Sequence, residues 1–363
     1  MPQSAYIHVP FCRSKCNYCS FVSYTNCDED CQKKYIETLI KEIQYFYKQE
    51  RLNTLYLGGG TPSLLRPCDI KRLISCFNIT PNSEITIEIN PETVDQNYLK
   101  ELSMTGVNRL SVGVQSLDND ILKTIGRIHT SEKAINTIQI AQEAGFKNIS
   151  VDFIYGLPNQ SLKSFISDLN TAIGLNIQHI SLYGLKIEEG CNFFKKIPQN
   201  IADDDQQADM YIAAVKTLLQ KGFIHYEISN FASSGCESKH NLNYWNCEEY
   251  YGFGVAAHGY VNGERYSNYT EIDEYLNKYL EKEYKQRLTL KEQLEESVFL
   301  GFRRGVGIDI SEINKKFGID FNEKYKDVIK KYIDSHYLIE TQNGYKLSTE
   351  GYLLSNNILA DFL

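Results

Sequence analysis

The sequence has no uninterrupted apolar run of about 18 residues, the length that a membrane-spanning helix requires. It also lacks an excess of basic residues, since 38 lysines and arginines stand against 46 aspartates and glutamates and give a formal charge of −8. This acidic balance argues against broad binding to nucleic acid or to anionic membranes. The N-terminus has neither the basic nor the apolar segment of a secretory signal, so we expect a soluble cytoplasmic protein.

Nothing in the composition indicates disorder. Of the 363 residues, 42% are hydrophobic and 23% are charged, as in ordinary globular proteins. A chain of this length has room for one large domain and one small domain. The ten cysteines are more informative. In a chain without an export signal, we interpret them as reduced thiols and cluster ligands rather than as disulfides.

Three of these cysteines, Cys12, Cys16 and Cys19, lie in one short loop after a strand-like apolar run. Such thiolates hold iron–sulfur clusters when the backbone wraps around a common centre. A cubane cluster normally has four thiolate ligands, but the next position that might supply one is Phe21. The loop therefore predicts a cluster with one iron open to a small ligand. The alternative is a helical stripe of core cysteines, which Pro10 beside the loop disfavours.

The first 220 residues alternate between β-branched apolar runs and longer segments of helical pattern. Six repeats of strand and helix predict a parallel sheet with helices outside it. This pattern alone fits either a partial α/β barrel or an open doubly wound sheet. We expect strands at residues 5–9, 54–57, 85–89, 109–114, 149–154 and 179–185, and helices at about residues 30–49, 67–77, 94–104, 131–144, 162–173 and 203–220.

Polar or glycine-rich residues stand at the ends of the predicted strands. The cysteine loop follows the first strand and the run Gly-Gly-Gly-Thr-Pro at residues 58–62 follows the second. Glu88, Gln115 and Asp152 lie on the third, fourth and fifth strands. This arrangement is expected when successive loops surround one site at the mouth of a barrel. We therefore predict an α/β fold with a partial (β/α)6 barrel over residues 1–221.

The rest of the chain divides into two parts. Residues 222–287 have an irregular pattern and predict a lid or an edge extension of the barrel. Residues 288–363 predict a small domain with a winged-helix-like order of helices and a hairpin. Its predicted helices are residues 290–302, 310–317 and 322–335, and Asn343-Gly344 marks the hairpin turn. From residue 286 to 363 there are 11 basic and 12 acidic residues, so we do not expect DNA binding.

The cysteine loop reads CxxxCxxC with Tyr18 before the last cysteine, and it resembles the cluster loop of the radical S-adenosylmethionine (SAM) superfamily. In that superfamily three cysteines hold a [4Fe-4S] cluster, SAM chelates the remaining iron, and electron transfer cleaves the sulfonium. The resemblance implies that Cys12, Cys16 and Cys19 are the cluster ligands. It also implies that the glycine run binds the methionyl amino group of SAM.

Longer segments are similar to the oxygen-independent coproporphyrinogen III dehydrogenase family and its close relatives. These segments are residues 6–12, 106–116, 126–129 and 152–158. In this resemblance the SAM-contacting residues are Tyr6, Gly59, Gly60, Thr61, Glu88, Gln115, Arg127 and Asp152. The carboxylates suit hydroxyls and ammonium, and the guanidinium suits a carboxylate. Taken singly, each residue could equally form an ordinary salt bridge or loop cap.

Two features depart from the dehydrogenases. Phe21 stands where they have a further cysteine, and Tyr6 lies almost at the start, so their N-terminal extension is missing. The chain instead carries His240-Asn-Leu-Asn-Tyr244-Trp245, which resembles the HNxxYW motif of the related HemW-type heme chaperones. The motif implies heme contacts, because imidazole can ligate iron and aromatic rings can lie against the macrocycle. A buried histidine beside a Tyr–Trp packing pair is the alternative.

Three functions follow from these patterns. The first is a heme chaperone that carries a [4Fe-4S] cluster and SAM, binds heme and passes it to recipient hemoproteins, including membrane-bound respiratory enzymes, as a monomer or a homodimer. The second is an oxygen-independent coproporphyrinogen III dehydrogenase, which performs a radical oxidative decarboxylation in heme biosynthesis. The third, radical modification of RNA, is disfavoured by the acidic charge. The resemblance favours the first and leaves open whether the protein is also an enzyme.

Overall fold

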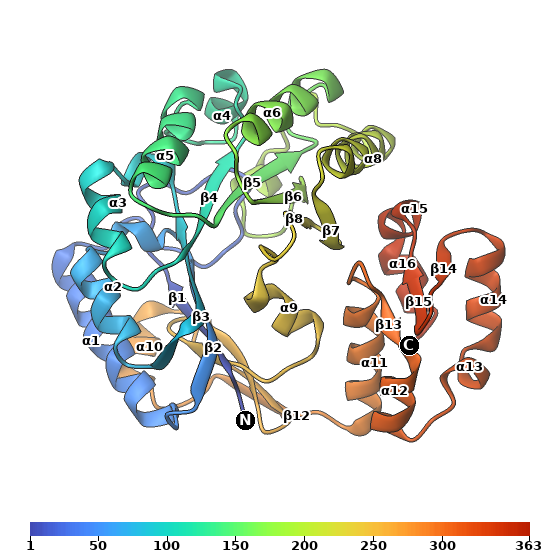
Figure 1. Cartoon of the computed structure of the whole chain (residues 1–363). Coiled ribbons are helices and arrows are strands. Elements are labelled where there is room, and N and C mark those ends of the chain that lie inside the picture. Colours follow the sequence, from blue (N-terminus) through green and yellow to red (C-terminus); the bar gives the residue numbers. More distant parts are fainter.

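The computed structural model describes residues 1–363, and its centre is a nine-stranded sheet with the order β7-β8-β6-β5-β4-β3-β2-β1-β9. Strands β1 to β6 are parallel, and helices cover the outer face of the sheet (Figure 1). The sheet curls without closing, because β7 and β9 are its two edges. This confirms the partial barrel. The strands are β1 (Ser4–Val9), β2 (Arg51–Gly59), β3 (Asn78–Ile89), β4 (Arg109–Gln115), β5 (Ile149–Tyr155), β6 (His179–Gly184), β7 (Ile224–Glu227), β8 (Asn230–Ala232) and β9 (Tyr251–Phe253).

The helices of the barrel confirm the predicted order, and most begin at a polar cap. Asp28 caps α1 by accepting a hydrogen bond from the Cys31 amide, and Asp203 and Gln206 form a capping box at α8. The short helices α4 and α7 were not predicted. The helices are α1 (Glu29–Phe46), α2 (Pro67–Ile74), α3 (Gln96–Ser103), α4 (Asn119–Thr124), α5 (Ser131–Glu143), α6 (Leu162–Gly174), α7 (Asn192–Lys195) and α8 (Asp204–Gln220), with 3-10 turns η1 (Pro62–Leu64) and η2 (Pro91–Thr93).

The strand alternation separates an apolar layer from a polar interior. Along β2, Leu55 and Leu57 are fully buried in the apolar core, whereas Tyr56 between them lines a cavity inside the barrel. The same alternation places Glu88 of β3 and Asp152 of β5 on the inner face. The apolar side chains on the outer face of the sheet pack on the helices, and polar side chains lie on the inner face.

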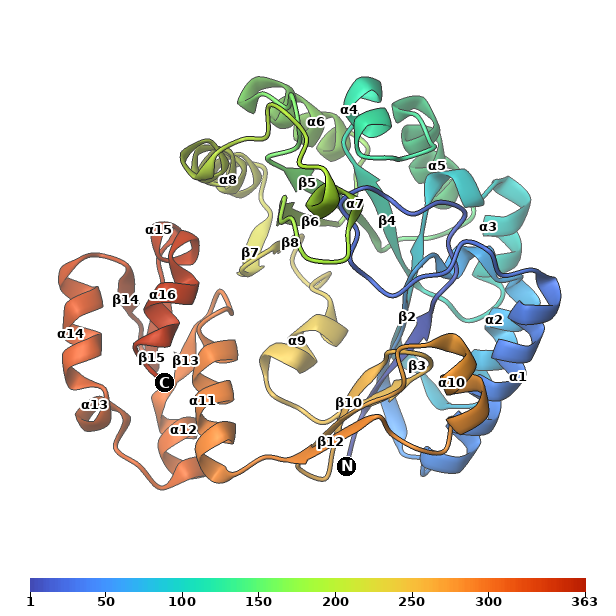
Figure 2. The same ribbon diagram turned by 180° about the vertical axis from the view of Figure 1, so that it is seen from behind.

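The region predicted to be irregular has regular structure of its own. It adds β9 in parallel to β1 and forms a three-stranded antiparallel sheet. Helix α9, which carries the HNxxYW motif, contacts β2 and the C-terminal helix α11 and lies between the open side of the barrel and the C-terminal unit (Figures 1 and 2). The elements are α9 (Lys239–Trp245), β10 (His258–Val261), β11 (Glu264–Ser267), α10 (Ile272–Lys278) and β12 (Tyr284–Arg287).

A buried ion pair joins this extension to helix α1. The Lys282 ammonium lies 2.8 Å from Glu42 Oε1, and the two side chains are 4% and 0% exposed. Glu42 also accepts hydrogen bonds from the Gly254 amide, Asn268 Nδ2 and the Tyr275 hydroxyl at 2.8 to 2.9 Å. The carboxylate is therefore fully satisfied, as a buried charge must be. This network anchors the extension to the barrel.

The C-terminal unit has the predicted order of helices and hairpin. Its small sheet runs β13-β15-β14. The hairpin is confirmed, but the chain turns at residues 341–343, and the predicted turn residue Gly344 already belongs to β15. The predicted helix at residues 322–335 is two helices, α13 and α14, and the last two helices were not predicted. The elements are α11 (Leu290–Gly301), β13 (Ile308–Asp309), α12 (Ile310–Phe317), α13 (Phe321–Lys324), α14 (Lys326–Asp334), β14 (Leu338–Glu340), β15 (Gly344–Leu347), α15 (Thr349–Leu353) and α16 (Ser355–Ala360). The division into domains after residues 221 and 287 stays a prediction. None of the helices combines the length and the apolar character needed to cross a membrane.

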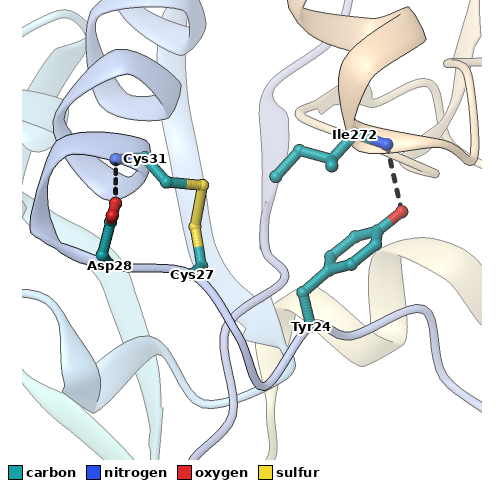
Figure 3. The surroundings of a disulfide bond; sticks show 5 residues. All are labelled: Tyr24, Cys27, Asp28, Cys31 and Ile272. Carbon is teal, nitrogen blue, oxygen red and sulfur yellow. Dashed lines mark hydrogen bonds between the residues drawn. A yellow bond between two sulfur atoms is a disulfide. The ribbon is translucent and has the colours of Figure 1, made fainter.

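The interpretation of all ten cysteines as free thiols or ligands is wrong for one pair. Cys27 and Cys31 form a disulfide at the start of α1, with their Cα atoms 5.5 Å apart (Figure 3). The other eight cysteines are free. Cys27 precedes the N-cap residue Asp28 and Cys31 lies in the first turn, so the change of chain direction at the cap brings the sulfurs together.

Candidate cofactor site

A cavity of about 540 Å³ opens at the carboxyl ends of the parallel strands. It is lined by the three cysteines of the loop and by seven of the eight residues predicted to contact SAM. These residues are Cys12, Cys16, Cys19, Gly59, Gly60, Thr61, Glu88, Gln115, Arg127 and Asp152. The structure therefore brings together residues that are up to 140 positions apart in the sequence (152 − 12).

The cysteine loop is fixed to its surroundings by backbone hydrogen bonds. The Cys12 amide donates to the Tyr24 carbonyl at 3.0 Å, and the Asn17 amide donates to the Ile125 carbonyl at 2.9 Å. A further bond within the loop joins the Cys19 amide to the Cys16 carbonyl at 3.2 Å. Both the start and the middle of the loop are thus tied to other parts of the barrel, which orients the three thiols toward the cavity.

Two of the three sulfurs accept hydrogen bonds from polar residues of the cavity. Thr61 Oγ1 lies 3.5 Å from Cys12 Sγ, and Arg127 Nη1 lies 3.6 Å from Cys16 Sγ. Such donors stabilise thiolates and tune the metal centres that thiolates hold. Three thiols that line one cavity fit the ligand set of an iron–sulfur cluster, in which each thiolate binds a different iron.

The glycine run is required by close backbone packing at the end of β2. Gly59 has φ +113°, and a Cβ atom there would lie 2.6 Å from the His8 ring. A Cβ atom on Gly60 would lie 2.7 Å from the Phe11 carbonyl oxygen. Only glycine fits at both positions, and the backbone beside the cysteine loop is thereby exposed to the cavity.

Two half-buried carboxylates line the cavity, and neither forms a salt bridge. Glu88 accepts hydrogen bonds from the Tyr56 hydroxyl at 2.9 Å and the Gly59 amide at 3.1 Å. Burial raises the pKa of Glu88 to about 7. Asp152 accepts from Ser111 Oγ at 2.9 Å, and burial raises its pKa as well. These carboxyl groups are held by neutral donors, so their remaining acceptor sites are available to hydroxyl or ammonium groups of a ligand.

Asn90, which was not among the predicted contacts, also lines the cavity and accepts a hydrogen bond from Arg127. The Arg127 Nη2 atom donates to Asn90 Oδ1 at 2.7 Å and to the Gly113 carbonyl at 2.5 Å. Asn90 Nδ2 in turn donates to Thr61 Oγ1 at 2.9 Å. Asn90 thus joins the guanidinium to the glycine run. It directly follows β3 and stands two residues after Glu88, and this alternation is the sequence signal that could have identified it.

Tyr6 is the one predicted SAM residue that does not line the cavity. Its hydroxyl is hydrogen-bonded to His8 Nδ1 at 3.0 Å, and its ring stacks on Tyr56 with the centroids 6.2 Å apart. Tyr56 itself lines the cavity. The predicted contact between Tyr6 and SAM stays a prediction, and in the structure Tyr6 is joined to the cavity through Tyr56.

The imidazole of His240 is buried and fully engaged. Its Nδ1 atom lies 2.7 Å from Thr54 Oγ1, and its Nε2 atom lies 2.8 Å from the Tyr244 hydroxyl. The ring stacks on Tyr56 with the centroids 5.1 Å apart. Burial, together with the Arg109 guanidinium, lowers the pKa of His240 to about 3, so the ring is neutral at physiological pH.

The other two motif residues face the C-terminal unit rather than the barrel cavity. Tyr244 lines a second cavity, of about 700 Å³, between α9, β11 and α11. Trp245 lies near the Arg303 guanidinium, and its indole N–H is buried without a partner. The walls of the second cavity include Tyr244, Cys247, Tyr250, Arg265, Phe299 and Leu363.

Phe21 stands at the rim of the barrel cavity, where it was predicted to replace a cysteine. Its side chain lines the cavity and is 66% exposed. The ring is therefore largely open to solvent, like other single exposed hydrophobic side chains of this protein. No fourth thiol lies at this position.

Comparison with known proteins identifies the families to which parts of the chain are similar. Residues 6–172 match the Radical SAM superfamily, and residues 288–354 match the HemN C-terminal domain. The solved structure of coproporphyrinogen III oxidase (HemN) from Escherichia coli superposes with a TM-score of 0.88 at 23% identity, over 99% of this chain and 90% of that chain. The fold is that of a radical SAM protein.

More similar sequences narrow this class. The heme chaperone HemW of Lactococcus lactis is 37% identical over 371 residues, which cover 100% of this chain and 97% of the relative. The heme chaperone HemW of Bacillus subtilis is 36% identical, with 99% of each chain covered. The chain belongs to the HemW family.

Proposed function

We propose that the protein is a heme chaperone, which binds heme and delivers it to hemoproteins. The observation that carries this proposal is the full-length similarity to proteins named heme chaperone HemW, combined with the HNxxYW motif on α9. The recipients are hemoproteins, and we include membrane-bound respiratory enzymes among them.

We further propose that Cys12, Cys16 and Cys19 hold a [4Fe-4S] cluster and that the barrel cavity holds SAM. Membership of the radical SAM superfamily supports both cofactors. The bound cluster would supply an iron with an open coordination position and an electron for the sulfonium of SAM. Within the chain, Thr61 and Arg127 stabilise the thiolates through the two sulfur hydrogen bonds.

The remaining cavity residues would bind and orient SAM. The backbone at Gly59 and Gly60 approaches the ligand closely because a side chain is sterically excluded there. Glu88 and Asp152 accept hydrogen bonds from its hydroxyl and ammonium groups, and Arg127 pairs with its carboxylate. Tyr6 acts through Tyr56, on which its ring stacks.

For heme, we propose that His240 is the iron ligand and that Tyr244 controls access to it. With the proton on Nδ1, the imidazole donates to Thr54, and Nε2 accepts from the Tyr244 hydroxyl. An iron would take the same lone pair on Nε2. Because Tyr244 also lines the second cavity, displacement of its hydroxyl would open Nε2 of His240 toward that cavity. Trp245 adds an aromatic surface beside the motif.

An oxygen-independent coproporphyrinogen III dehydrogenase is the second candidate. The structural likeness to the Escherichia coli coproporphyrinogen III oxidase and the intact cavity residues favour it. Phe21 argues against it, because the dehydrogenases have a cysteine at this position. The motif on α9 is also better explained by heme.

One experiment distinguishes the two candidates. Protein reconstituted anaerobically with iron, sulfide and SAM is given a reductant and either heme or coproporphyrinogen III. Stoichiometric retention of heme without decarboxylated product supports the chaperone. Decarboxylated product formed in proportion to the SAM consumed would replace the proposal by the dehydrogenase.

The Phe21→Cys variant tests whether the residue at position 21 alone determines which of the two functions the protein has. We expect it to yield no decarboxylated product, because a thiol at the rim does not supply the other features of the dehydrogenases. Appearance of protoporphyrinogen in this variant, but not in Phe21→Leu, would show that Phe21 alone separates the two functions.

A further inference from the structure

The disulfide between Cys27 and Cys31 has no part in the proposed heme function, yet it lies next to the cysteine loop in the chain. Of the ten cysteines only this pair is bonded, and the other eight are free. The three loop cysteines must remain reduced to serve as ligands. One protein therefore holds thiols that have to be reduced and a pair that is oxidised, only eight residues apart (27 − 19).

The pair is accessible to small molecules. Both cysteines are partly exposed and pack against the edge of the apolar core, not inside it. The bond closes a turn with a sequence separation of only four. Exchange with a thiol requires a sulfur that solvent can reach, and labile disulfides are commonly exposed. This geometry therefore permits attack without unfolding of the barrel.

Two residues of the chain separate the disulfide from Tyr24, which is hydrogen-bonded to a proposed cluster ligand. Tyr24, three residues before Cys27, accepts a hydrogen bond from the Cys12 amide through its carbonyl and donates through its own amide to the Pro10 carbonyl. Its hydroxyl donates to the Thr270 carbonyl at 2.9 Å. The same hydroxyl accepts from the Ile272 amide at 3.0 Å (Figure 3). Tyr24 thus ties the start of the cysteine loop to the extension, and the disulfide fixes the chain directly after it.

We propose that Cys27 and Cys31 are a redox-active pair, which low-molecular-weight thiols interconvert between disulfide and dithiol, and that the disulfide holds the Tyr24 segment against the cysteine loop. In the reductive direction, a thiolate attacks one sulfur and forms a mixed disulfide, and a second thiol releases it. Cys27 and Cys31 each gain one hydrogen, and two small thiols become one small disulfide. Reduction frees residue 27 and loosens the segment to which Cys12 is hydrogen-bonded.

The first test counts thiols in cluster-free, full-length protein equilibrated anaerobically at defined ratios of reduced to oxidised glutathione. After denaturation and alkylation, the mass gives the number of modified cysteines. We expect eight at low ratios, which are the eight free cysteines of the structure, and ten at high ratios. The variant Cys27→Ser/Cys31→Ser should show eight at every ratio. The exposed Cys68 provides the control, since Cys68→Ser should lower each count by one without moving the transition. A constant count in the wild-type protein, either eight or ten, would overturn the proposal.

The second test measures the link to the cysteine loop by amide hydrogen exchange. The Cys12 amide should exchange about tenfold faster in the dithiol form than in the disulfide form. The reason is that reduction removes the disulfide that fixes the chain directly after Tyr24. In the Cys27→Ser/Cys31→Ser variant the Cys12 amide should exchange at the faster rate under both reducing and oxidising conditions. Equal rates in the two redox states of the wild-type protein would refute the link, whatever the result with heme. If the double variant does not fold, the single variant Cys27→Ser replaces it, and its Cys12 amide should also exchange at the faster rate.

Discussion

The Nε2 atom of His240 lies 2.8 Å from the hydroxyl of Tyr244, one turn further along α9. The same imidazole is held at Nδ1 by Thr54, and the residue is 1% exposed. The histidine of the HNxxYW motif is therefore a structural residue in this state of the protein, whatever else it does. The two roles require separate measurements.

The structural role predicts a large loss of stability on truncation. His240→Ala should lower the free energy of unfolding by about 3 kcal/mol, because it leaves a cavity and removes two buried hydrogen bonds. Urea denaturation of the cluster-free protein measures this change. The exposed His258 provides the control, and His258→Ala should change the stability by less than about 0.5 kcal/mol. Equal losses in the two variants would contradict the structural role.

The binding role predicts a gain on removal of the tyrosine hydroxyl. Tyr244→Phe keeps the ring but frees Nε2, so heme no longer competes with a hydrogen bond worth about 1 kcal/mol. Heme should bind about fivefold more tightly, with the ligand spectrum of the wild-type complex. Titration followed by absorbance measures both quantities. Weaker binding, or a changed spectrum, would show that the iron uses another ligand or the tyrosine itself.

The raised pKa of Glu88 predicts a pH dependence of stability. A carboxyl group whose pKa rises from 4.5 to about 7 on folding binds its proton more tightly in the folded state. The free energy of unfolding should therefore fall as the pH rises from about 4.5 to about 7, and Glu88→Gln should flatten this part of the profile. Denaturation of cluster-free protein at several pH values measures it. Glu29→Gln, at an exposed position of α1, should leave the profile unchanged. Parallel profiles for wild type and Glu88→Gln would refute the assignment.

The close packing at Gly60 predicts a loss of cofactor binding. In Gly60→Ala the new Cβ would lie 2.7 Å from the Phe11 carbonyl oxygen, so the backbone next to the cysteine loop must move. We expect SAM to bind at least about tenfold more weakly and the protein to lose about 1 to 3 kcal/mol of stability. Calorimetric titration of reconstituted protein measures the affinity. Gly174→Ala is the matched control, because a Cβ there meets no atom within 4 Å. Wild-type affinity in Gly60→Ala would remove the glycine run from the SAM site.

The thiols of the loop predict the metal content. Replacement of Cys12, Cys16 and Cys19 by Ala should abolish the brown colour and the bound iron and sulfide of protein purified under argon. Cys68→Ala and Cys76→Ala, which change two thiols outside the cavity, should retain both elements. Iron and sulfide retained in the triple variant would disprove the cluster assignment.

Much of the barrel cavity was predictable from the sequence because its residues stand at the ends of strands. Parallel strands bring their carboxyl ends to one edge, so Glu88, Gln115 and Asp152 had to meet near the cysteine loop once the order of strands was recognised. Asn90 was predictable by the same reasoning. The family resemblance then supplied the roles that the pattern alone does not specify.

Contacts between residues far apart in the sequence could not be predicted from the sequence. The partner of His240 is Thr54, 186 residues earlier, and no local pattern connects a threonine in β2 to a helix in the extension. The same holds for Glu42 and Lys282, 240 residues apart. The disulfide was missed for a different reason, because the absence of an export signal argued against any disulfide.

The addition of β9 to the edge of β1 has a consequence for biosynthesis. Residues 5–7 pair with residues 251–253, so the first strand of the barrel gains its outer neighbour only after about 250 residues have been translated. Until then a nascent chain exposes the unpaired backbone groups of β1, directly before the cysteine loop. A ribosome paused before residue 251 therefore holds an open strand edge next to the three thiols, which makes this interval the period when the nascent chain most needs protection from aggregation.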